Sequence, residues 1–264
     1  MELFRALAAL AEAPAKDLAP VAEALLIGPL PDAHAYTELF IFQLYPYASV
    51  YLGAEGMIGG DARQLIAGFW RALGQSPPVE PDHLALMLAL YARLSELEDQ
   101  ESEPLRKEGW HHARITFLWE HLLSWLPVYL SKLDTIAPPF YREWGKVLMN
   151  ALMTEAASAG EPVRLPLHLR ESKCLVDPRA GGAVEEFLQS LLSPVRSGMI
   201  LVRADLAHAA RQLDLGLRLG ERSFILKALF GQDPQGMLDW LAGEARLWTT
   251  RHRSKREALG VVAA

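Results

Sequence analysis

The sequence predicts an all-α fold, and three observations predict it. Apolar residues recur at intervals of three and four along almost the whole chain, and the alternating runs typical of strands are nearly absent. Proline and glycine divide the chain into segments of helical length. Hydrophobic residues make up 51% of the 264 residues, which is enough for a substantial core and excludes disorder as the general state.

The chain is expected to open with a helix, because three leucines within residues 3–10 share one helical face. Glu2 stands where a secretory signal has a basic residue, and Arg5 interrupts the apolar run. We therefore interpret this segment as an amphipathic helix of the fold and not as a targeting peptide. Further along, Asp32 is predicted to cap a helix that runs through Phe40.

The middle of the chain alternates between a loop and two long helices. Residues 45–60 contain one proline and four glycines with few helical repeats, which indicates a turn or loop. The motif Glu80-Pro81-Asp82-His83 is predicted to open a helix with Pro81 at its first position. Another helical pattern runs from Pro104 to Lys132, and Pro127 is expected to kink or divide it.

Residues 161–182 are irregular and rich in proline and glycine, so they are the best boundary in the chain. We expect a helical body over residues 1–160, an irregular linker over 161–182 and a C-terminal helical segment over 183–264. Four helical patterns are predicted in this last part, at residues 184–192, 203–213, 221–230 and 234–251.

Charge is distributed unevenly between the two parts. Residues 1–163 hold 11 Lys and Arg against 21 Asp and Glu, a net of −10, while residues 164–264 hold 15 against 11, a net of +4. An acidic body favours basic partners and repels nucleic acid. The longest uncharged run, residues 39–54, is 16 residues long, which is short of the roughly 20 needed to span a bilayer. The sequence predicts a cytoplasmic protein without direct membrane insertion.

Signatures of catalysis are missing from the sequence. It has no phosphate-binding glycine loop, no H-E-x-x-H motif and no nucleophile elbow. Cys174 is the only cysteine, which excludes an internal disulfide and a thiolate zinc site. The eight histidines are scattered, and the acidic run at residues 96–103 is typical of a solvated turn. We predict no enzyme, no metal and no cofactor; a hydrolase would require a carboxylate or histidine cluster in a cleft.

Three segments carry a resemblance to a known family. They are Tyr36-Thr-Glu-Leu-Phe40 with the following Tyr45-Pro-Tyr-Ala-Ser-Val-Tyr-Leu52, then Glu80-Pro-Asp-His83, then Phe117-Leu-Trp-Glu-His-Leu-Leu-Ser-Trp-Leu-Pro127. In this order and spacing they resemble the TorD/DmsD (NarJ-like) family of molybdoenzyme-specific chaperones. The resemblance covers about residues 30–155 and implies a TorD-like helical bundle with an additional C-terminal helical segment.

The resemblance also implies a function and a partner. Such a chaperone binds the N-terminal or twin-arginine signal region of the precursor of a molybdopterin-dependent catalytic subunit, of the DMSO reductase family. It holds that region for cofactor insertion and assembly. It needs no cofactor of its own, and as a monomer or dimer it engages no nucleic acid.

A basic, apolar client segment requires acidic groups and aromatic anchors. The candidate binding residues are Tyr36, Tyr45, Tyr47, Tyr51, Glu80, Asp82, His83, Trp119 and His121. Each has a structural alternative: the aromatic residues and His121 in the core, and Asp82 and His83 in local contacts at a helix start. Glu80 is expected to be exposed, and so is Trp119, because it lies off the apolar stripe of its helix.

The C-terminal part offers an alternative function. Residues 203–227 can be drawn as helix, turn and helix, which would suit a DNA-binding regulator acting through residues 180–256. The basic residues do not concentrate on one recognition helix, and the acidic body would repel DNA. We therefore favour a plain helical hairpin.

Overall fold

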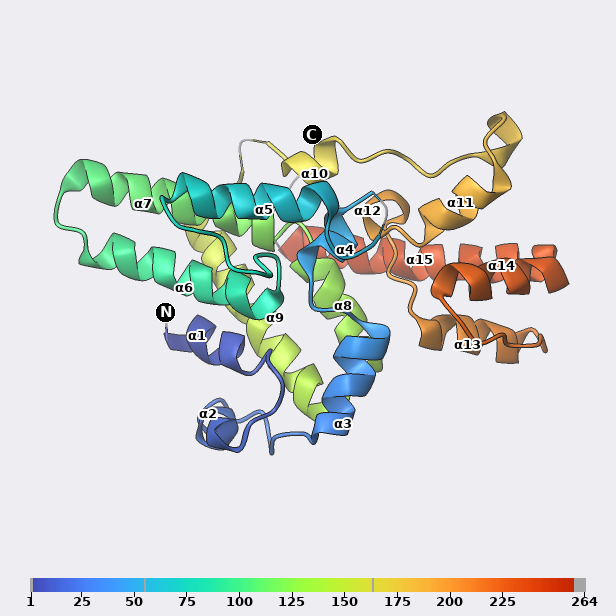
Figure 1. Ribbon diagram of the computed structural model, residues 1–264, viewed down its shortest axis with the longest axis horizontal. Helices are drawn as coiled ribbons and strands as arrows, with labels where there is room; N and C mark the ends of the chain where they lie inside the picture. Colours follow the sequence, from blue (N-terminus) through green and yellow to red (C-terminus); the bar gives the residue numbers. More distant parts are fainter. Residues whose placement is uncertain (1, 55, 163, 259–264) are drawn as a thin grey trace.

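The computed structural model describes residues 2–54, 56–162 and 164–258, and it is helical throughout (Figure 1). Within these residues it has fifteen α-helices, two short 3-10 helices and two π-helical segments. The one extended pairing in the described part of the chain is an isolated antiparallel bridge between Tyr47 and His83. The predicted all-α class is confirmed. In the same ranges, no helix combines the length and apolar character that crossing a membrane requires.

The first nine α-helices form the body. They are α1 (Glu2–Ala9), α2 (Ala19–Ala24), α3 (Ala33–Tyr36), α4 (Ala48–Leu52), α5 (Gly60–Ala72), α6 (Leu84–Gln100), α7 (Pro104–Thr116), α8 (Leu126–Ile136) and α9 (Pro139–Ala159). Helices α6 and α7 form an antiparallel pair, α1 packs along α6, and α8 packs along α9 (Figure 1). The predicted cap is present, because the Asp32 carboxylate accepts a hydrogen bond from the Ala35 N–H at 2.8 Å.

Two helices of the body continue into π-helical segments. Thr37–Gln43 extends α3, and Phe117–Leu122 extends α7. Each ends on a backbone hydrogen bond across five residues, from Leu44 N to Leu39 O at 2.7 Å and from Leu123 N to Leu118 O at 2.8 Å. The long pattern predicted from Pro104 to Lys132 is thus divided, and α8 begins with Pro127 in its first turn.

The start of α6 differs from the prediction. The motif Glu80–His83 forms a turn, Pro81 lies outside the helix, and α6 begins only at Leu84. The reason is a pairing with a distant part of the chain: Leu84 N donates to Pro46 O at 2.8 Å, and Ala48 N donates to Asp82 O at 3.0 Å. These bonds hold the motif in a turn that ends at His83, whose backbone is extended.

Within residues 164–258 the structure has six helices, and the four predicted patterns are confirmed. They are α10 (Leu167–Arg170), α11 (Val184–Leu191), α12 (Pro194–Ser197), α13 (Arg203–Gln212), α14 (Arg222–Gln232) and α15 (Pro234–Ala258). Before α11 the chain is irregular apart from α10 and one 3-10 turn. Cys174 lies exposed on this stretch, and its carbonyl accepts a hydrogen bond from Arg196 at 3.2 Å.

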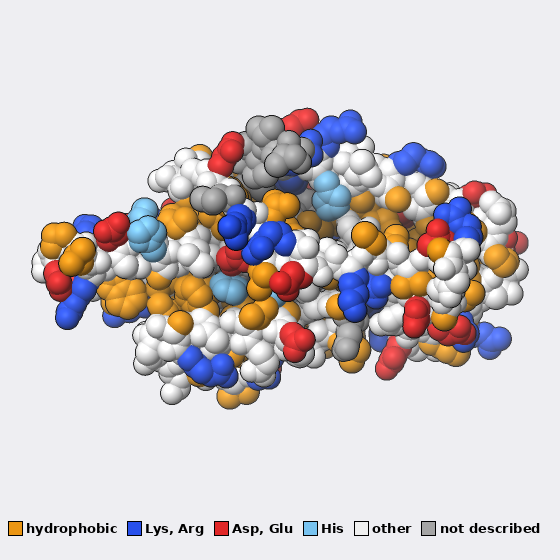
Figure 2. Space-filling model, turned by 90° about the horizontal axis from the view of Figure 1, so that it is seen from above, with side chains coloured by type: hydrophobic (Ala, Val, Ile, Leu, Met, Phe, Trp, Pro, Cys, Tyr) orange, Lys and Arg blue, Asp and Glu red, His pale blue; other side chains and the backbone are white. Residues whose placement is uncertain are grey.

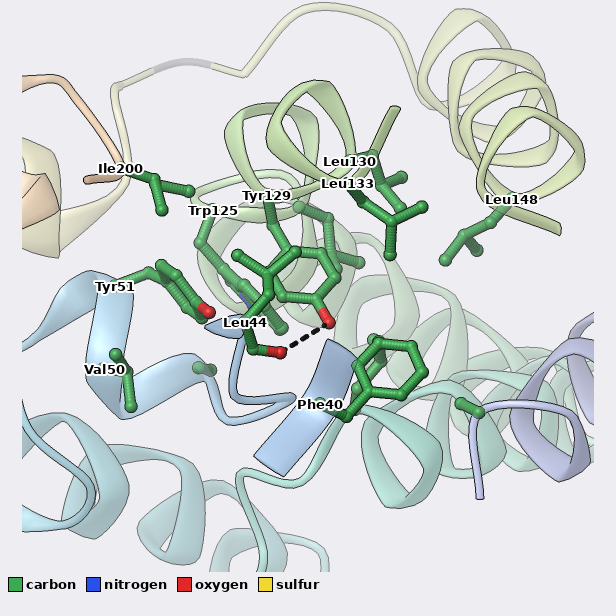
Figure 3. Packing of buried hydrophobic residues seen from close by; sticks show 14 of the residues in the cluster. Phe40, Leu44, Val50, Tyr51, Trp125, Tyr129, Leu130, Leu133, Leu148 and Ile200 are labelled. Atoms are coloured by element: carbon green, nitrogen blue, oxygen red, sulfur yellow. Dashed lines mark hydrogen bonds between the residues drawn. The ribbon is translucent and has the colours of Figure 1, made fainter. Parts of the chain in front are cut away.

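The buried hydrophobic residues of both parts form one continuous cluster. Figure 3 shows Tyr51 and Trp125 of the body beside Ile200 of the C-terminal part. Tyr51 stacks on Trp125 with ring centroids 5.3 Å apart, and Tyr129 OH donates to Leu44 O at 3.4 Å. The C-terminal helices therefore pack on the body, and the proposed division at residues 161–182 stays a prediction.

Candidate functional site

The segment around Tyr47 and the motif Glu80–His83 lie side by side, although they are more than thirty residues apart in the chain. The Tyr47–His83 bridge and the two backbone bonds described above hold them together. Both segments belong to the family resemblance, so the fold brings two of its three motifs to one place.

Asp82 fastens this junction from inside. Its side chain is 1% exposed and accepts hydrogen bonds from the Ser49 hydroxyl at 2.5 Å and the Ser49 N–H at 3.3 Å. The Ser49 hydroxyl in turn accepts from Gly59 N at 3.0 Å, and Arg63 Nε lies 3.8 Å from the other Asp82 oxygen. Asp82 is thus placed as a positioning residue that orders the two segments and the glycine-rich loop.

Above this anchor, two tyrosines lie among acidic groups. The Tyr47 ring meets the His83 ring edge to face at 5.0 Å, and His83 Nδ1 lies 3.7 Å from a carboxylate oxygen of Glu12. Burial and the Glu80 carboxylate raise the pKa of Tyr47 to about 12. Burial raises the pKa of Tyr36 as well, with further contributions from Glu12 and Glu80.

The contacts and electrostatic interactions just described connect five side chains, which we call the tyrosine–glutamate surface: Glu12, Tyr36, Tyr47, Glu80 and His83. Glu12 and Glu80 are exposed, the tyrosines are half-buried, and His83 lies buried beneath them. Carboxylates accept paired hydrogen bonds from a guanidinium, and a tyrosine face can pack against the same group. The arrangement suits recognition of a basic peptide. In the described ranges, no group of three or more His, Cys, Asp or Glu side chains could hold a metal ion.

The other two predicted tyrosines lie elsewhere. Tyr51 is buried in the core against Trp125, and its hydroxyl donates to Tyr45 O at 2.7 Å. Tyr45 is half-buried and lines a separate cavity of about 420 Å³ together with Phe42 and Arg222. The structure therefore does not bring Tyr45 and Tyr51 to the tyrosine–glutamate surface.

Trp119 was expected to be exposed, and this expectation is wrong, because the residue is only 7% exposed. It belongs to the π-helical segment, where the wider turn rotates side chains away from the positions of an α-helix. Trp119 lines an apolar cavity described below.

His121 is buried between Phe69 and Phe117, with ring centroids 5.3 Å away in each case. Burial, and then the neighbouring His168, lower its pKa to about 4, so His121 is neutral at physiological pH. It lies in the aromatic core of the body and not in the tyrosine–glutamate surface.

Glu12 is the site residue that sequence reasoning missed. It follows α1 in a stretch without a motif, and no spacing connects it to His83. Only the packing of α1 along α6 brings it there.

Comparison with known proteins supports the family resemblance. Residues 5–130 match the protein-family model described as nitrate reductase delta subunit. This match and the relatives below support the resemblance to the NarJ/TorD-like chaperone family over the matched part of the chain.

Two curated relatives are similar to this chain, both described as "Chaperone protein TorD", from Vibrio vulnificus strains YJ016 and CMCP6. Each is 30% identical over 91 residues, which is 33% of this chain. The match spans 42% of the length of these relatives.

Proposed function

We propose that the protein is a chaperone, not an enzyme, for the precursor of a molybdopterin-dependent catalytic subunit of the DMSO reductase family. It binds the N-terminal or twin-arginine signal region of this client in the cytoplasm and holds it for cofactor insertion and assembly. The observation that carries the proposal is the tyrosine–glutamate surface, which lies where two motifs of a chaperone family meet.

The chemistry of this surface fits an arginine-bearing segment. Glu12 and Glu80 each offer a carboxylate to a guanidinium, while Tyr36 and Tyr47 offer aromatic faces that lose little conformational entropy on binding. The net charge of −10 over residues 1–163 attracts such a segment from a distance. Screening weakens this attraction, so binding should fall as ionic strength rises.

In this proposal Asp82 contributes indirectly, because it holds the segment around Tyr47 against the motif Glu80–His83. Since it is buried against Ser49, its replacement would disturb the junction itself, and loss of binding would not show direct contact. The exposed glutamates are the cleaner probes.

The testing experiment is a pull-down from native cytoplasm, with the captured proteins identified by mass spectrometry. The chain is compared with a Glu12→Gln, Glu80→Gln variant, which removes two charges while keeping shape. A matched control, Asp99→Asn with Glu108→Gln, removes two exposed charges of α6 and α7. We expect the wild type and the control to capture a molybdopterin-dependent catalytic subunit. The first variant should capture at least about tenfold less, because charge-assisted hydrogen bonds contribute about 1.5–3 kcal/mol each.

Two outcomes would reject the proposal. Capture of general chaperones alone would leave no specific client. Recovery of DNA that salt releases, from wild type and both variants alike, would transfer the function to the helical hairpin within residues 180–256.

A further inference from the structure

An apolar cavity of about 340 Å³ lies where the body, the irregular segment and the C-terminal helices meet. Its walls come from five places in the chain, represented by Tyr51, Trp119, Leu165, Val195 and Lys255. The cavity exists only because the C-terminal part packs on the body. Figure 2 shows hydrophobic side chains gathered in the hollows of the face that is uppermost in Figure 1, where α10 lies, bordered by charged side chains.

Trp119, one of the residues that line this cavity, has a buried hydrogen-bond donor without an acceptor. The indole Nε1 of Trp119 is buried, and no acceptor lies within hydrogen-bond distance among the described residues. A buried N–H without a partner costs about 1–3 kcal/mol, so such groups are rare unless something else satisfies them. An occupant with a carbonyl oxygen would supply the acceptor.

The rim of the cavity is basic. Three residues from the last turns of α15 lie there, namely His252, Lys255 and Arg256. The His252 Nε2–H donates to Gly198 O at 2.6 Å, which fastens the end of α15 to α12. Lys255 and Arg256 form no ion pair within the described ranges, so their charges are available to an occupant.

We propose that this cavity binds an apolar peptide segment followed by an acidic residue, and that the segment belongs to the client. The proposal rests on the function proposed above and adds a second contact to it. Apolar side chains enter the cavity, whose volume lies near the lower end of the roughly 300–1,000 Å³ of ligand pockets. Trp119 donates to a peptide carbonyl, and Lys255 and Arg256 meet the carboxylate.

The two surfaces then bind client segments of opposite charge. The tyrosine–glutamate surface receives its basic part, and the cavity receives an apolar part with an acidic flank. This gives the C-terminal helices a role in recognition, because α12 and α15 complete the cavity.

The test uses two synthetic peptides with a dye at one end, both blocked at their termini. They share one apolar core of leucine and valine, which is followed by two aspartates in one peptide and by two lysines in the other. Fluorescence anisotropy measures their affinity for the full chain, for Lys255→Glu with Arg256→Glu, and for Trp119→Phe. The matched control is Arg106→Glu with Lys107→Glu, which makes the same charge change on exposed residues of α7.

We expect the wild type and the control to prefer the aspartate peptide by about tenfold or more, and the charge reversal at the rim to invert the preference. Trp119→Phe should weaken both peptides by about tenfold, since it removes the donor while a smaller aromatic ring remains. Equal binding of the two peptides, or a preference that survives charge reversal, would overturn the proposal.

Other occupants of the cavity would also be detected. A chain shortened after residue 258 that binds the aspartate peptide about tenfold tighter would assign the cavity to residues 259–264 and overturn the client as occupant. Native mass spectrometry that finds a small molecule of constant mass on the wild type, and not on Trp119→Phe, would do the same. The pull-down with the Glu12 and Glu80 variants is independent of these measurements, so the two proposals can fail separately.

Discussion

A single buried imidazole gives the protein a defined response to acid. The pKa of His121 is about 4 in the folded chain, against an ordinary value of 6.5. The unfolded chain therefore takes up a proton first as the pH falls. The contribution of neutral His121 to the free energy of unfolding is fully present above about pH 6.5. It is lost progressively toward pH 4, and its magnitude is on the order of 3 kcal/mol.

We expect the free energy of unfolding to fall by about 1–2 kcal/mol more between pH 7 and pH 5 in the wild type than in His121→Leu. Burial lowers the pKa of His168 too, but His168 is present in both chains and its effect cancels. Urea unfolding at the two pH values measures the difference, with the exposed His112→Leu as control. Equal pH dependence in wild type and His121→Leu would contradict the assigned cause.

Single residues were the least predictable part of the site. Glu80 is exposed as the sequence indicated, and Tyr47 reaches the surface. Asp82 is an anchor because Ser49, far away in the chain, supplies its hydrogen bonds. The expectation that Trp119 is exposed was wrong because it assumed an α-helical period. The π-helical segment that contains Trp119 does not follow that period.

Between elements, one buried ion pair fastens the C-terminal part to the body. Lys132 of α8 donates to Asp205 of α13 at 2.6 Å, and the Lys132 side chain is 4% exposed. Asp205 also accepts from the Val202 N–H at 2.7 Å and so caps its own helix. Removing Asp205 should therefore have different consequences from removing Lys132.

We predict that Asp205→Ala lowers the free energy of unfolding by about 3–5 kcal/mol, because it leaves the buried ammonium of Lys132 without a counter-charge. Lys132→Met should be much milder, since an apolar chain of similar length replaces the charge. Combining Lys132→Met with Asp205→Asn should recover most of the loss. Urea denaturation of the four chains tests this order, and equal losses in both single variants would contradict it.

Helices were largely predictable, because periodicity and caps are local properties. The four C-terminal helices begin within one residue of the predicted positions, and Asp32 caps α3. The start of α6 was not predictable in this way. Its motif has the composition of a helix start, but pairing with residues 46–48 holds it in a turn that ends at the extended His83.

At the scale of the molecule, a continuous core joins the body and the C-terminal helices. The two parts should therefore lose structure together. We expect tryptophan fluorescence and far-ultraviolet circular dichroism to report one coincident transition in urea. Two separated transitions would indicate that the parts unfold independently, as the proposed boundary at residues 161–182 would permit.

The charge difference between the two parts was evident from composition, and so was the fold class. The cavity could not be predicted, since its walls come from segments separated by more than a hundred residues and only the packed structure unites them.

The lone exposed thiol of Cys174 makes the molecule convenient to follow optically. A maleimide dye will attach at one defined place without any engineering, on the irregular stretch between the body and the C-terminal helices. Trp119 lies in the wall of the cavity that the beginning of this stretch also lines, so energy transfer or quenching between tryptophan and dye would register rearrangement of this stretch in real time.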